Sequence, residues 1–194
     1  MDVIAPNTST SRDPAPGRLA LVQELVNTLD VELGDDELSD RAALESWLRG
    51  RGLIRSGDVL ADGDLERTRS FREALRTLLD EHSGEMERTR AAVALKAAAP
   101  IALLRVSFGA DGAPSLEPAA PGLDGALADL LAIIERAACD GTWQRLKVCA
   151  EHTCRFAFYD QSRNRSGSWC SMAVCGNRAK ARSYRERRRS APAA

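Results

Sequence analysis

Apolar residues recur every three or four positions through most of the first 140 residues of this 194-residue chain. This period predicts amphipathic helices, each with one buried face. We expect Ser39 to cap the second of these helices and Asp62 the third. The predicted helices span residues 18–29, 40–50, 63–82, 86–98 and 124–138.

The period changes once in this region. Residues 104–108 alternate apolar and polar side chains, which is the spacing of a β-strand. Asp111-Gly112 offers a tight turn, and residues 115–117 are placed to return as a second strand. We therefore predict that residues 18–139 form a mostly helical domain with one small β-hairpin.

Both ends of the chain lack a periodic pattern. Residues 1–17 are rich in Pro, Ser and Thr, so we expect a disordered tail there, with a second short tail at 191–194. The first 18 residues have neither the basic start nor the apolar core of a secretory signal, and no apolar run reaches about 18 residues. We therefore expect a cytoplasmic protein that does not cross a membrane, with reduced cysteines.

Charge divides the chain into two parts, although the formal net charge is only −1. Residues 1–140 carry 15 basic and 25 acidic side chains, whereas residues 141–194 carry 12 basic and 3 acidic ones. A basic segment of this kind is a candidate for binding a polyanion.

Catalytic patterns are missing from the sequence. It contains no Ser/His/Asp arrangement, no Gly-rich phosphate loop and no His-rich metal motif. We interpret the acidic run Asp35-Asp36-Glu37 as solvated surface charge, and His82 as a residue at a helix end. The chain is therefore not expected to be an enzyme.

Four of the five cysteines form two pairs with the same internal spacing. Cys149 and Cys154 are separated by four residues, as are Cys170 and Cys175. Two such short knuckles can bring four thiolates to one tetrahedral zinc ion, and a shell of four cysteines is typical of a structural site. We predict one structural Zn²⁺ per chain, held by these four residues.

Two further residues could bind metal by their type. Cys139 falls outside the pattern and is interpreted as a small apolar residue. His152 lies inside the first knuckle, but four cysteines already complete the coordination shell.

The segment between the knuckles has the pattern of a β-hairpin, with residues 155–160 as one strand and 168–170 as the other. Its aromatic residues could stack on bases, but a module of this size needs them for its core, so we expect packing. They are Phe156, Phe158, Tyr159 and Trp169.

A basic helix is predicted after the second knuckle, with Asn177 as its cap. It contains seven basic residues and one acid, and such a row can follow a phosphate backbone, although a solvated tail is the alternative. Arg178 equally suits a structural bond to Asp160 or to backbone carbonyls. The candidate nucleic-acid contacts are Arg178, Lys180, Arg182, Arg185, Arg187, Arg188 and Arg189 on the helix, with Arg163 and Arg165 on the hairpin turn.

The C-terminal segment resembles the CGNR zinc-finger family, whose four-residue motif stands here as Cys175-Gly176-Asn177-Arg178. The run LVNTLD at Leu25–Asp30 and the pair Trp47-Leu48 are similar to the ABATE domain that usually precedes this finger, and that domain is named for stress-induced transcriptional regulation. The resemblance implies a bacterial regulator with an ABATE-like domain over 18–139 and a zinc finger over 140–190.

Together these observations predict an α+β protein: a mostly helical domain with a small hairpin, followed by a four-cysteine zinc finger with a hairpin and a basic C-terminal helix. The leading hypothesis is a zinc-dependent transcriptional regulator that binds duplex DNA. In it, the helical domain forms a homodimer, senses a small-molecule effector or meets another protein. The alternative is an RNA-binding or protein-docking module.

Overall fold

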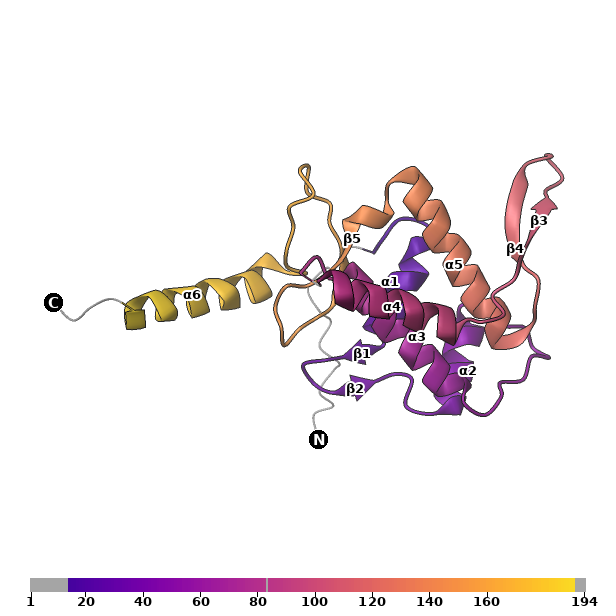
Figure 1. Ribbon diagram of the computed structural model, residues 1–194, viewed down its shortest axis with the longest axis horizontal. Helices are drawn as coiled ribbons and strands as arrows, with labels where there is room; N and C mark the ends of the chain where they lie inside the picture. Colours follow the sequence, from indigo (N-terminus) through magenta and orange to yellow (C-terminus); the bar gives the residue numbers. More distant parts are fainter. Residues whose placement is uncertain (1–13, 83, 191–194) are drawn as a thin grey trace, which may run out of the picture.

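The computed structural model describes residues 14–82 and 84–190. It confirms the α+β class, with a helical body and short antiparallel strand pairs (Figure 1). The helices are α1 (Leu19–Asn27), α2 (Arg41–Gly50), α3 (Asp64–Leu79), α4 (Glu85–Ala98), α5 (Gly122–Asp140) and α6 (Asn177–Ser190). The strands pair as β1 (Leu29–Asp30) with β2 (Asp35–Asp36), β3 (Leu104–Phe108) with β4 (Pro114–Pro118), and β5 (Leu146–Val148) with β6 (Ala157–Tyr159).

The predicted caps of two helices are wrong. Asp40, not Ser39, caps α2, because its Oδ1 accepts the backbone N–H of Ala43 at 2.8 Å. Helix α3 begins after Gly63, which has a left-handed φ of 89°. It ends at Leu79 rather than His82, because the next residue leaves the helical region.

The core lies where α1 packs against α3 and α5. The apolar stripe of α1 is buried as its period predicts, and it meets the fully buried Phe71 of α3 and Leu127 of α5. Helix α5 is strongly apolar and lies in this core. Within the residues that the structure describes, no helix has both the length and the apolar character that a membrane crossing needs.

The same core continues into the cysteine-rich segment, since Leu146, Val148 and Ala157 belong to it. Asn27 of α1 accepts the N–H of Ala157 at 2.7 Å and donates to its carbonyl at 2.9 Å. Arg76 of α3 donates to the carbonyl of Arg155 at 2.7 Å. The helical pattern of residues 18–139 predicts that they can fold on their own, and a fragment ending at Asp140 would have to do so without these contacts.

Order begins before the predicted position. Ala15 is buried and its N–H donates to Oε1 of Gln23 at 2.6 Å. The prediction of a disordered tail is therefore wrong for residues 14–17, while residues 1–13 and 191–194 lie outside the described part.

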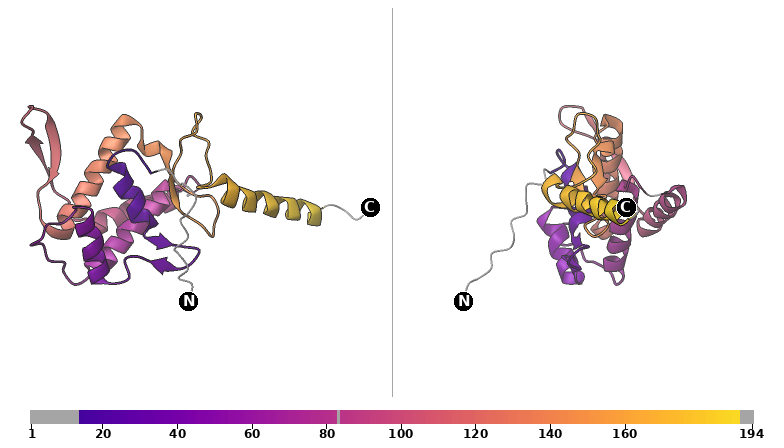
Figure 2. Two further views of the ribbon diagram at one scale, coloured as in Figure 1. Left: turned by 180° about the vertical axis from the view of Figure 1, so that it is seen from behind. Right: turned by 90° about the vertical axis from the view of Figure 1, so that its left-hand side faces the viewer.

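The two most prominent projections are at opposite ends of the long axis. The β3–β4 hairpin extends from one end and α6 extends from the other (Figures 1 and 2). The hairpin matches the predicted strands, with β4 extending one residue further on each side.

Candidate metal centre and basic helix

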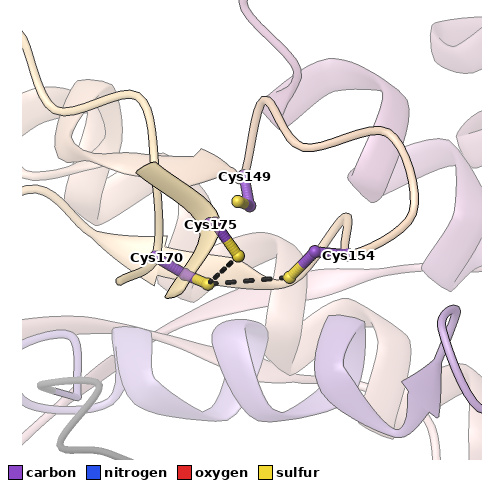
Figure 3. A group of neighbouring side chains, drawn as sticks. All are labelled: Cys149, Cys154, Cys170 and Cys175. Carbon is purple, nitrogen blue, oxygen red and sulfur yellow. Dashed lines mark hydrogen bonds between the residues drawn. The ribbon is translucent and has the colours of Figure 1, made fainter. Parts of the chain in front are cut away.

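Four cysteines from separate segments meet beside the core. Cys149 follows β5 and Cys154 precedes β6. Cys175 lies in the π-helical turn Met172–Gly176 that leads into α6, and Cys170 precedes that turn. Their Sγ atoms all lie within 4.8 Å of one another, and the side chains point toward a common centre (Figure 3). The structure thus brings together all four of the predicted ligands.

The spacing of the thiols fits a tetrahedral ion. Bonds of about 2.3 Å from sulfur to metal give sulfur–sulfur edges of about 3.8 Å. The Sγ of Cys170 lies 3.6 Å from that of Cys154 and 3.8 Å from that of Cys175. These separations are far longer than the roughly 2.05 Å of a disulfide. The four cysteines could therefore hold one metal ion.

Ionisation of the cluster also suits a cation. Hydrogen bonds from Cys154 and then Cys170 lower the pKa of the Cys149 thiol to about 2. Burial and then the charge at Cys149 raise the pKa of Cys175 to about 12. A thiolate at one cysteine therefore disfavours ionisation of its neighbours. A divalent cation at the centre would stabilise the thiolate form of all four.

Neither of the other candidate ligands joins the cluster. His152 is exposed, with Nδ1 3.0 Å from Oε1 of Glu151. Cys139, interpreted as a small apolar residue, lies outside the cluster as expected, but it is exposed and its thiol donates to Oε1 of Glu135 at 3.2 Å.

The predicted hairpin of this module has the wrong partner strand. Strand β6 pairs with β5, so the first knuckle forms the hairpin turn, and the N–H of Cys149 donates to the carbonyl of Phe156 at 2.9 Å. The segment 168–170 contributes one backbone bond, from the N–H of Ala150 to the carbonyl of Ser168, and no strand. Strand β5 takes this position because Leu146 and Val148 belong to the core, with the buried Lys147 between them.

The polar turn after β6 is built around the buried carboxylate of Asp160. It accepts the N–H groups of Ser162 and Gly167, each at 2.9 Å, and pairs with the buried Lys147 at 3.0 Å. Burial acts to raise the pKa of Asp160, but these bonds outweigh it and lower the pKa to about 2. Arg163 and Arg165 are exposed on this ordered turn.

The aromatic residues pack, as predicted. Phe156 and Trp169 lie against the cysteine cluster, and Tyr159 packs on the main core. Phe158 is itself buried.

The first turns of α6 are held by two carboxylates that the sequence reasoning missed. Arg178 donates to both oxygens of Glu32 at 2.8 and 2.9 Å, rather than to Asp160 or to a backbone carbonyl. Arg182 donates to both oxygens of the buried Glu151 at 3.2 and 2.9 Å. Glu151 lies inside the first knuckle, and its position there could have identified it as a partner for the basic helix. Nothing in the sequence indicates Glu32 as a partner.

The rest of α6 extends away from the body (Figures 1 and 2). Arg185 donates back to the carbonyl of Ala181 at 3.1 Å, and the Arg188 guanidinium lies 5.9 Å from the ring centroid of Tyr184. Apart from the paired Arg178 and Arg182, five basic side chains of α6 are exposed: Lys180 in its first turn, and Arg185, Arg187, Arg188 and Arg189 further along. The nine predicted contacts thus fall into two groups, because Arg178 and Arg182 are held by carboxylates of the body while the other seven are exposed.

Two cysteine knuckles that converge on one centre and lead into a helix define a zinc-finger class of module. Residues 145–188 match the CGNR zinc finger, and residues 19–141 match ABATE, described as "Putative stress-induced transcription regulator". No curated protein matches the chain. Because the ABATE match covers more than half of its length, the chain belongs to the ABATE family, with a CGNR zinc finger at its C-terminal side. The resemblance inferred from the sequence is confirmed.

Proposed function

We propose that this protein is a transcriptional regulator that binds duplex DNA through the exposed part of α6. One observation carries the proposal: five basic side chains project from a helix whose base is fixed, while their nearest basic neighbours are already neutralised by Glu32 and Glu151. Phosphate oxygens are suitable acceptors for such a row.

We propose that the ion held by the four cysteines is zinc, at one per chain, and that its role is structural. Four thiolates leave no open position for water or substrate. The ion would fix the turn that carries Cys175, and α6 begins two residues later. The orientation of the basic helix therefore depends on the metal.

We assign no enzymatic role to the chain. The family description of ABATE supports regulation and suggests a stress response as its context. The turn with Arg163 and Arg165 is fixed by Asp160 and Lys147, so it is a second candidate contact to the DNA backbone.

Salt dependence of binding tests this function. Seven candidate contacts remain after Arg178 and Arg182 are set aside. If four or five of them reach phosphates, a plot of log affinity against log salt should have a slope of about −4 per chain on duplex DNA. Fluorescence anisotropy with a labelled duplex measures that slope, and a hairpin RNA of equal charge is the competitor. A flat plot, or stronger binding to the RNA, would favour the docking or RNA-binding alternative.

A further inference from the structure

The β3–β4 hairpin exposes an apolar surface far from α6. Its strands pair only with each other within the described residues. The register places Leu104, Val106 and Phe108 on one face with their β4 partners, while Arg105 and Ser107 lie on the other. Val106 is 63% exposed and Phe108 is 70% exposed. Side chains of this kind are usually covered when they gather in one place.

The outer edge of β3, on the side away from β4, has backbone N–H and C=O groups with no partner strand in the described part of the chain. In an antiparallel pair, successive residues direct their N–H and C=O groups alternately toward the partner strand and away from it. Ala119 donates to the carbonyl of Leu103, and Gly109 donates to that of Ala113, each at 2.9 Å. Odd-numbered residues of β3 therefore face β4, and residues 104, 106 and 108 direct their N–H and C=O groups outward.

The outer edge of β4 is blocked in the corresponding places. The residues opposite 104, 106 and 108 are Pro118, Leu116 and Pro114. These three point their backbone groups outward, and proline has no N–H to donate. The outer edge of β4 thus has one donor in these positions, whereas the edge of β3 has three. Of the two edges of this hairpin, only that of β3 suits the addition of another strand.

We propose that β3 pairs with β3 of a second copy of this chain, antiparallel and around a two-fold axis at Val106. In this register Val106 faces Val106 of the second copy, and Leu104 faces Phe108. Arg105 faces Ser107, so no like charges oppose each other. The result is a four-stranded sheet in which β4 forms both outer edges.

A second copy is the occupant because the segment Leu104–Phe108 is complementary to itself. All three outward-facing residues of each strand find a partner, which satisfies six N–H groups with six carbonyls. Every apolar side chain faces an apolar one. Ile101 and Leu103, which precede β3, are also exposed.

Two variants at the two-fold axis test the pairing in the full-length chain. Sedimentation of the wild-type protein should give twice the chain mass of 21.0 kDa. Val106→Lys should raise the dimer dissociation constant at least about tenfold, because it places two like charges opposite each other, and Val106→Glu should do the same. An equimolar mixture of the two variants should regain the dimer. A monomeric wild type, or a mixture that stays monomeric, would contradict the proposal.

Leu116→Lys is the matched control, since Leu116 lies on the same face but on the blocked strand. It should leave the dimer intact. Loss of the dimer in Leu116→Lys would contradict edge pairing and indicate an interface through the apolar face. A dimer that survives Val106→Lys would also contradict the proposal, because the contact would then lie elsewhere. Because α6 lies at the other end of the molecule, the DNA salt slope per chain should be unchanged in Val106→Lys (Figure 1). A failed dimer prediction therefore does not affect the test of DNA binding.

Discussion

Helices α3 and α6 are both rich in arginine, but their arginines have different surroundings. On α3, Arg72 is 3% exposed and donates to both oxygens of Asp36 at 2.6 and 2.9 Å. Arg76 is equally buried and donates to the carbonyls of Val26 and Arg155. On α6, the arginines beyond Arg182 extend along an exposed helix.

The difference follows from the supply of acceptors. The first 140 residues contain an excess of ten acidic side chains, so arginines there can be neutralised within the fold. The segment after residue 140 has three acids, and two of them, Glu151 and Asp160, are buried and already paired. The arginines of α6 beyond Arg182 therefore have few carboxylates of their own segment to pair with, which supports the proposal that they bind an external polyanion.

Metal removal should have the largest effect, and it should act on α6 more than on α3. Zinc binding in small modules is worth on the order of 10 to 16 kcal/mol, and here it would fix the turn that carries α6. Cys170→Ser should therefore lose the metal and abolish DNA binding. Metal analysis and anisotropy check both results. Cys139→Ser is the control, and a change in its metal content would contradict the assignment of ligands.

The next largest effect is expected from the buried arginines. Arg72→Met removes one partner of a buried ion pair and leaves Asp36 without its main donor, which should cost about 3 kcal/mol of unfolding free energy. Arg187→Met on α6 should leave that free energy almost unchanged, because its side chain is exposed. Denaturant titration of both variants gives the comparison. Equal losses would show that α6 is part of the folded core.

A smaller effect should distinguish the two paired arginines within α6. Arg182→Ala removes the two guanidinium donors of the buried carboxylate of Glu151, whereas Arg178→Ala breaks an ion pair whose side chains are both partly exposed. We expect Arg182→Ala to lower the midpoint of thermal unfolding more than Arg178→Ala does. The opposite order would mean that Glu32, from the helical domain, is the main support of α6.

Local patterns predicted much of this fold. The apolar period located the helices, and the paired spacing of Cys149, Cys154, Cys170 and Cys175 identified a cluster that the structure brings together. Both signals are short in sequence, so they do not depend on how distant segments meet.

The larger errors involve contacts between distant segments. The period of residues 155–160 predicted a strand, but the choice of β5 as its partner depended on the shared core. In the same way, the charge of Arg178 was evident while its partner, Glu32, lies 146 residues away in sequence. Sequence patterns therefore indicate which residues carry charge, and the packing of the fold decides which of those charges remain available.

The central claim is that the exposed arginines of α6 bind phosphate. Its most direct test compares the salt slope of duplex binding after loss of exposed arginines with the slope after loss of a paired one. Arg185→Ala combined with Arg188→Ala should flatten the slope of about −4 by up to about two units, with zinc content and helicity unchanged. Arg178→Ala should leave the slope as it is, because Arg178 is already bound to Glu32. Equal slopes for the wild type and the double variant would contradict the claim that the exposed arginines of α6 bind phosphate.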